Sequence, residues 1–118
     1  MTKETEQVCK EILAEIANGG KFSELKSYGD LFMGAEGIIS NMAWLVSPLL
    51  EAEQAYRIRV QSYRKDGESV AGATAKAQCD PEYLEYKKIQ YVYDLADEQC
   101  KLIKKFADKL ESEWNRTK

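Results

Sequence analysis

Apolar residues recur every three or four positions along most of this chain, which is the spacing of one face of an α-helix. The first repeat comprises Val8, Cys9, Ile12, Leu13 and Ile16. It predicts a helix over residues 3–18, which Asn18-Gly19-Gly20 should end because glycine favours the conformation that closes a helix. Ser23 is expected to start a short turn that Gly29 ends.

A second repeat predicts a long helix that begins between Asp30 and Ile38 and runs to Lys65. Its apolar face comprises Ile38, Met42, Leu45, Leu49, Ala52, Tyr56, Val60 and Tyr63. Pro48 lies inside this run. Because proline lacks the N–H that an interior helical position donates, we expect a kink or a break there.

Two helix-start signals follow this long segment. Asp66-Gly67 is typical of a turn, and Ser69 can cap a short alanine-rich helix over 70–78. Asp80-Pro81-Glu82 then places a capping acid, a first-turn proline and a first-turn acid in order. The chain should therefore continue as a short helix followed by another long one.

The last repeat predicts a helix from Pro81 to about Trp114, with two adjacent apolar rows. The first row comprises Ile89, Val92, Ala96, Cys100, Ile103, Ala107, Leu110 and Trp114. The second row comprises Leu84, Tyr91, Leu95, Leu102 and Phe106. Two rows make a wider apolar face than one partner helix needs, so either the N-terminal helix or another copy of the protein should cover the second row.

These elements predict an all-α fold: a long helical hairpin with a short connecting helix and an N-terminal helix, forming a three- to four-helix bundle. One domain should span residues 1–118, with the N-terminal helix and a linker in 1–30 and the hairpin in 31–118. In the antiparallel hairpin, Trp44 and Leu45 are expected to meet Phe106 and Leu110.

Composition excludes several classes of protein. The 118 residues carry a net charge of −3, so no basic nucleic-acid tail is present. Cys9, Cys79 and Cys100 are an odd, scattered set, which fits a reducing cytoplasm better than a disulfide framework. The sequence Met42-Ala43-Trp44-Leu45-Val46 is the longest apolar run and is too short to span a membrane. We therefore expect a cytoplasmic protein that does not insert into a membrane.

The residue types needed for most enzymes are missing. There is no histidine, which removes the commonest general base and the histidine-dependent nucleophiles and metal sites. No glycine-rich phosphate-binding motif is present. Glu51 with Glu53, or Asp94 with Asp97 and Glu98, could in principle share a metal ion. Asp94 and Glu98 beside Lys101 and Lys104 are instead interpreted as a salt-bridged exposed face. The sequence predicts no catalytic residue, no metal and no cofactor.

Basic and aromatic residues gather around the expected tip of the hairpin. The candidate binding residues are Arg57, Arg59, Tyr63, Arg64, Lys65, Lys87 and Lys88. Arginine and lysine beside aromatic rings can hold phosphates and stack on bases, and tyrosine and arginine are also common at the centre of protein interfaces. The same basic residues could instead pair with Glu51, Glu53, Glu82 and Glu85 on an ordinary surface.

Part of the chain resembles a group of small helical proteins encoded by bacteriophages and prophages. The resemblance covers roughly residues 51–107. It is carried by Glu53-Gln54-Ala55-Tyr56-Arg57, Asp66-Gly67-Glu68-Ser69-Val70-Ala71, Asp80-Pro81-Glu82-Tyr83 and Tyr86-Lys87-Lys88. Such proteins are often encoded near genes for single-strand annealing and replication. The resemblance implies a phage origin and residence in the host cytoplasm, and it implies no catalytic residue.

Two functions are therefore expected, both of them non-enzymatic. In the first, the protein is an accessory of DNA recombination or replication that binds single-stranded nucleic acid or a recombinase. In the second, it inhibits a host defence protein, such as a CRISPR nuclease, by protein–protein contact. The salt dependence of binding distinguishes the two functions, because binding through phosphate contacts weakens steeply as the salt concentration rises. The double apolar row further predicts a homo-oligomer.

Overall fold

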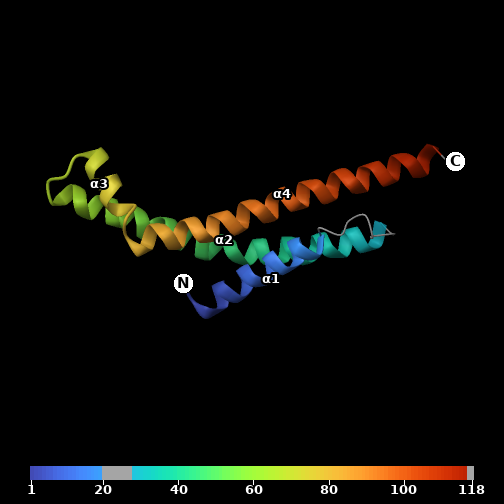
Figure 1. The fold of residues 1–118 in the computed structure, drawn as a ribbon, viewed down its shortest axis with the longest axis horizontal. Helices are drawn as coiled ribbons and strands as arrows, with labels where there is room; N and C mark the ends of the chain where they lie inside the picture. The colour runs from blue at the N-terminus through green and yellow to red at the C-terminus, as the bar shows by residue number, and fades with distance from the viewer. Residues whose placement is uncertain (20–27, 117–118) are drawn as a thin grey trace.

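The computed structural model describes residues 1–19 and 28–116, which form four helices and no strand. The helices are α1 (Lys3–Gly19), α2 (Tyr28–Lys65), α3 (Val70–Ala77) and α4 (Pro81–Arg116). Figure 1 shows α2 and α4 side by side in opposite directions, with α1 alongside their middle and α3 at one end. The molecule is a rod of 69 × 28 × 19 Å. The expected all-α hairpin with a short connecting helix is confirmed.

Helix α1 matches the predicted segment closely and gains a cap that the sequence analysis did not identify. Thr2 Oγ1 accepts a hydrogen bond from the Thr5 N–H at 3.1 Å, and the two hydroxyl groups lie 2.8 Å apart. This satisfies one of the backbone donors that the start of a helix leaves open. Cys9 and Ile12 are buried on the inner face, whereas Leu13 is exposed.

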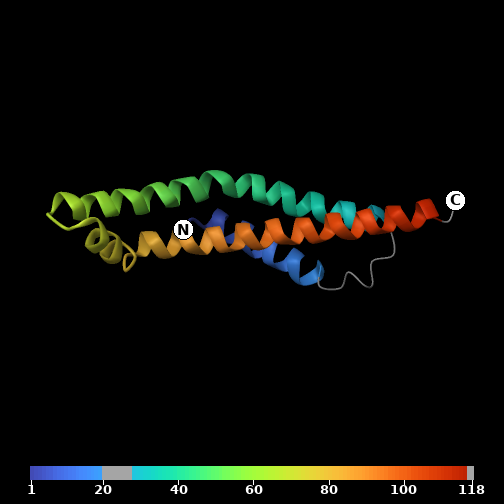
Figure 2. The ribbon, with the colours of Figure 1, turned by 90° about the horizontal axis from the view of Figure 1, so that it is seen from above.

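Helix α2 begins earlier than expected, at Tyr28, and continues without a break through Pro48. The predicted turn over residues 23–28 falls mostly outside the described residues, and Gly29, expected to end it, lies inside α2. The predicted break at Pro48 is therefore wrong. Figure 2 shows instead that α2 is bowed away from α4 along its length. Packing against α1 and α4 on either side of Pro48 keeps the helix continuous despite the missing donor.

The tip of the hairpin forms as the capping signals predict. Gly67 adopts a φ of 97°, which a residue with a side chain rarely tolerates. The hydroxyl oxygen of Ser69 accepts a hydrogen bond from the Gly72 N–H at 3.1 Å and caps α3. Ala73 and Ala77 are fully buried, and α3 packs on the end of α2. Their small side chains allow this short helix to lie close to α2.

The core lies between α1, α2 and α4. Its buried members are Cys9, Ile12, Ile38, Leu45, Ala52, Ile89, Val92, Ala96 and Ile103. All of them belong to the predicted apolar faces, so the helical periodicity identified the buried side of each long helix. One polar residue, Gln99, is also buried on α4.

The pairing of α2 with α4 differs from the predicted one. Cys100 Sγ lies 4.0 Å from Met42 Sδ, which fixes these two residues opposite each other. Trp44 lies two residues beyond Met42 and Phe106 six residues beyond Cys100. Because the helices are antiparallel, these offsets run in opposite directions and separate the two residues by eight positions, or about 12 Å. Trp44 instead borders a shallow surface with Lys3, Glu4, Gln7 and Val8 at the start of α1. The predicted contact of Trp44 and Leu45 with Phe106 and Leu110 is therefore wrong.

The N-terminal helix does not cover the second row of α4. Helix α1 packs against both long helices, but Leu84, Tyr91 and Leu102 remain 57%, 64% and 54% exposed. The other two members of the row differ, because Leu95 is half-buried and Phe106 packs against the core. Of the two covers expected from the sequence, α1 is thereby excluded for Leu84, Tyr91 and Leu102.

Candidate functional site

Three tyrosine rings meet where α4 begins. The ring of Tyr56, on α2, lies 5.0 Å from that of Tyr83 and 5.9 Å from that of Tyr86, centre to centre. Tyr83 and Tyr86 are three residues apart, so they share one face of α4 and both reach Tyr56. All three rings are half-buried, so part of each aromatic surface stays open to solvent.

Basic side chains border these rings. The Nζ atom of Lys87 lies 5.0 Å from the ring centre of Tyr86 and 5.7 Å from that of Tyr83, within the range of cation–π attraction. Lys87 also donates a hydrogen bond to Gln90 Oε1 at 3.0 Å, and its side chain is exposed. Tyr56, Tyr83, Tyr86 and Lys87 are called the tyrosine–lysine cluster below.

A second group joins the end of α2 to the start of α4. Arg59 Nε donates to Asp80 Oδ2 at 2.9 Å, and the Tyr63 hydroxyl donates to the same oxygen at 2.9 Å. Arg59 also donates to the Tyr63 hydroxyl at 3.0 Å. Asp80 is the residue just before α4, and these bonds link it to two successive turns of α2. Arg59, Tyr63 and Asp80 are called the clasp.

The clasp changes the pKa of its carboxyl group. Partial desolvation raises the pKa of Asp80, but the hydrogen bonds from Arg59 and Tyr63 and the charge of Arg59 outweigh it, so the pKa lies below its ordinary value. The hydrogen bond to Asp80 raises the pKa of Arg59 in turn. The clasp is therefore ionised at neutral pH and links the end of α2 to the residue before α4.

The structure places the seven predicted binding residues in different surroundings. Arg59 and Tyr63 belong to the clasp, and Lys87 to the tyrosine–lysine cluster. Arg57 pairs with Glu53 at 2.7 Å, as expected for an ordinary surface, yet its side chain is 72% exposed. The remaining three, Arg64, Lys65 and Lys88, are exposed. Lys88 follows Lys87 directly and so points about 100° away from it around α4.

Sequence reasoning did not include three members of this region among the binding residues: Tyr56, Tyr83 and Tyr86. Their spacing could have suggested a shared face on α4, but not the approach of Tyr56 from α2. Asp80 was expected as a helix cap, and it does precede Pro81. Its carboxylate instead accepts hydrogen bonds from Arg59 and Tyr63, a contact across 21 residues that no local pattern indicates.

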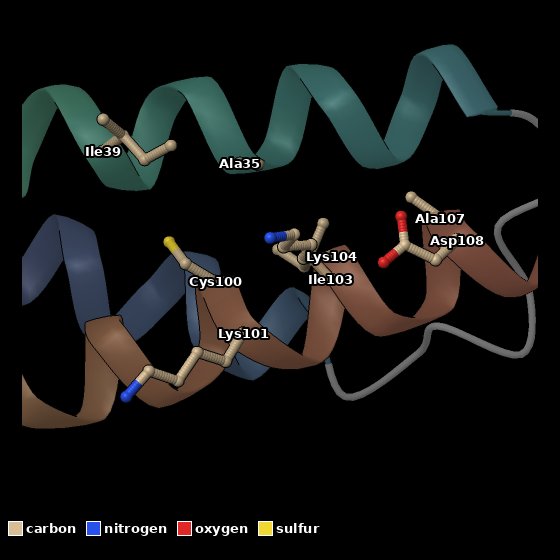
Figure 3. A pocket seen from close by; sticks show the side chains of 8 residues that line it. All are labelled: Ala35, Ile39, Cys100, Lys101, Ile103, Lys104, Ala107 and Asp108. Atoms are coloured by element: carbon tan, nitrogen blue, oxygen red, sulfur yellow. The ribbon is translucent and has the colours of Figure 1, made fainter.

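A groove of about 470 Å³ lies between α2 and α4, toward the C-terminal half of α4. Figure 3 shows Ala35 and Ile39 on α2 facing Cys100 and Ala107 on α4, while the ammonium end of Lys101 points away from α2. Small alanine side chains on both helices leave this space open. Its walls are apolar and its charges lie at the rim, so it offers room for an apolar group but no catalytic pair.

The thiols of Cys9, which is buried, and of Cys100, which is half-buried, are poorly suited to nucleophilic chemistry. Burial raises the pKa of the Cys100 thiol, and the nearby Asp97 carboxylate raises it further. Burial likewise raises the pKa of Cys9, with a smaller contribution from Glu6. Because the thiolate is the reactive form, both groups stay protonated and inert at neutral pH.

Two further findings concern the residues that the structure describes. Among them, no group of three or more cysteine, aspartate or glutamate side chains is arranged to hold a metal ion. None of the helices is long and apolar enough to cross a membrane. Lys101 pairs with Asp97 at 3.0 Å, next to Asp94 and Glu98, the two positions for which a salt-bridged face is expected.

Replacing Asp80 by asparagine should remove a pH-dependent part of the stability. The folded-state pKa of Asp80 is lowered, so its contribution is present above the ordinary carboxyl pKa of about 4 and is lost as the pH falls through the lower folded value. Thermal unfolding should show the variant melting below the wild type at neutral pH, with the difference closing in acid. Asp94→Asn, on an exposed part of α4, is the matched control. A difference that stays constant with pH would show that the clasp is not ionised.

Comparison with protein families, with curated proteins and with solved structures finds no match for this chain. Its function therefore has to be inferred from the contacts and the surface chemistry of the chain itself.

Proposed function

We propose that this protein acts by binding rather than by catalysis, as a phage-encoded accessory of DNA recombination or replication. Its tyrosine–lysine cluster contacts single-stranded nucleic acid, alone or as held by a recombinase. The observation that carries the proposal is the position of Lys87, exposed and within 6 Å of two half-open tyrosine rings. This combines a phosphate-binding charge with surfaces on which bases can stack.

The surrounding surface supports the same function. Arg57 is adjacent in sequence to Tyr56, and its pair with Glu53 is exposed and therefore weak. Arg64 lies two helical turns further along the same side of α2, about 10 Å away. Three cations can then contact phosphates, with stacking on the tyrosines contributing about 1–3 kcal/mol per base. The net charge of −3 means that this binding depends on the local face and not on the whole molecule.

Binding of a labelled single-stranded oligonucleotide, followed by fluorescence anisotropy across a salt series, tests the proposal. About three phosphate contacts predict that log K falls with log salt with a slope of about −2. Lys87→Glu should weaken binding by about tenfold or more, because it places a negative charge beside the phosphates.

Lys105→Glu is the matched control. It makes the same charge change at an exposed position on α4, 18 residues and about 27 Å away. An equal loss of affinity in both variants would show that only the overall charge matters. Absence of any salt-sensitive binding by the wild type would overturn the nucleic-acid function.

A second candidate function, inhibition of a host defence protein, is favoured by a different surface. The outward side of α2 exposes three large apolar residues: Val46, Leu50 and Ile58, at 41%, 60% and 55%. Such residues suit a protein partner. A host protein retained on the immobilised chain after nuclease treatment and high salt, and lost on Leu50→Glu, would support this function instead.

A further inference from the structure

We infer that two copies of this chain associate through the second row of α4, as an antiparallel helix pair with its two-fold axis beside position 93. This goes beyond the proposed function, because it needs neither nucleic acid nor a host protein. The starting observation is that Leu84, Tyr91 and Leu102 stay more than half exposed after α1, α2 and α3 have packed.

Four members of the second row, Leu84, Tyr91, Leu95 and Leu102, have the spacing of a helix–helix seam, whereas Phe106 packs against the core. Alternating steps of four and three residues give the seam positions Leu84, Lys88, Tyr91, Leu95, Glu98 and Leu102. This is the pattern by which two helices interlock their side chains. The segment covers 19 residues and is about 28 Å long. Four of the six positions are apolar, and the other two carry opposite charges.

The two charged positions decide the direction of the partner helix. In a parallel pair each residue faces its own copy, so Lys88 would face lysine and Glu98 would face glutamate. In an antiparallel pair centred on position 93, Lys88 faces Glu98 of the other copy, and this contact occurs twice. Like charges opposite each other are unfavourable and opposite charges are favourable, so the antiparallel arrangement is selected.

The apolar positions fit the same arrangement. With the centre at position 93, Leu84 faces Leu102 and Tyr91 faces Leu95. No apolar residue then faces a charge over the whole segment. Moving the partner by one heptad toward the C-terminus would place Leu95 opposite Glu98 and Lys88 opposite Lys105. Residues 84–102 are therefore self-complementary in one register, as an interface with two-fold symmetry requires.

The exposed apolar residues of α2 lack this fit when Ile39 is paired with Leu50, because Glu36 would then lie opposite Glu53 at the next layer. The partner that fits the second row of α4 is therefore a second copy of this chain.

A charge-swap experiment tests the inference by sedimentation velocity over a range of protein concentrations, without nucleic acid. The wild type should change from one to two chain masses as concentration rises. Lys88→Glu alone, or Glu98→Lys alone, creates two like-charge contacts in the dimer and should raise the dissociation constant by at least about tenfold. The double variant Lys88→Glu with Glu98→Lys restores both contacts and should dimerise like the wild type.

Both positions are exposed, so each variant should retain the helical circular dichroism of the wild type. Lys109→Glu, on α4 outside the 84–102 segment, is the control and should leave the dissociation constant unchanged. A wild type that stays monomeric at every concentration would overturn the inference. The inference would also be overturned if the single variants left the dissociation constant unchanged, or if the double variant dimerised as weakly as the single variants. None of these outcomes bears on nucleic-acid binding, which is measured separately.

Discussion

Replacing Leu45 by alanine should lower the free energy of unfolding by about 3 to 4 kcal/mol. Leu45 is one of the largest fully buried side chains and lies in the core that α1, α2 and α4 share. Alanine loses the apolar contacts of the removed carbons and leaves a cavity that rigid helices cannot fill. Since domains are stable by only about 5–15 kcal/mol, urea unfolding followed by circular dichroism should show a large shift of the midpoint.

Leu50→Ala provides the matched control for this result. It is the same substitution on the same helix, but Leu50 is 60% exposed and its removal opens no cavity. Its effect should remain below about 1 kcal/mol. Equal destabilisation of the two variants would contradict the assignment of Leu45 to the inner face of α2 and Leu50 to the outer face.

Replacing Ala77 by leucine should lower the free energy of unfolding by about 1–3 kcal/mol and loosen the tip of the hairpin. Ala77 is fully buried where α3 packs on α2, so there is no room for three more carbon atoms. Asp80 follows three residues later, and a displaced α3 would pull its carboxylate away from Arg59 and Tyr63. The melting temperature measures the loss of stability, and its pH dependence reports whether the clasp has opened.

The same substitution at Ala75, on the exposed side of α3, separates packing from helix propensity. Leucine and alanine are both good helix formers, so Ala75→Leu should change the stability by less than about 0.5 kcal/mol. A comparable loss in both variants would mean that α3 does not depend on close packing against α2.

The local parts of the fold could be predicted from the sequence because their causes are local. The repeat of Ile38, Leu45 and Ala52 follows directly from the geometry of one helix, and the structure buries all three. The effects of Gly67 and Ser69 extend over only a few neighbouring residues. The positive φ of Gly67 and the helix cap formed by Ser69 were therefore both foreseeable. The apolar repeat of α1 starts only at Val8, so it does not indicate the capping threonine, Thr2, six residues earlier.

The pairing of the two long helices could not be predicted in the same way. An apolar face repeats every three or four residues, so sliding one helix by a turn brings similar residues together again. In the structure two contacts mark the pairing: Asp80 lies beside Arg59 and Tyr63, and Cys100 lies beside Met42. The start of α4 therefore lies alongside α2 and not beyond its end, and Trp44 lies away from Phe106.

The candidate site shows the same division. The sequence placed basic and aromatic residues near the tip of the hairpin, and the structure does bring Lys87 against two tyrosines. The sequence could not show that Arg59 and Tyr63 bind Asp80 within the fold, because Asp80 lies 17 to 21 residues away along the chain. The sequence alone could not distinguish the surroundings of Lys88 from those of Lys87, because they depend on which face of α4 packs inward.

The position of α1 along the rod divides the molecule into parts of unequal stability. Helix α1 lies beside the middle of the hairpin, and the amino group of Met1 lies 2.8 Å from Glu85 Oε1. Beyond that point α3, the clasp and the ring contact of Tyr56 with Tyr83 close the tip. Backbone amides there should exchange hydrogen through openings that leave α1 docked, whereas amides near Leu45 and Ala96 should exchange only when the whole chain unfolds. A partner that binds the tip can therefore change its conformation without unfolding the core.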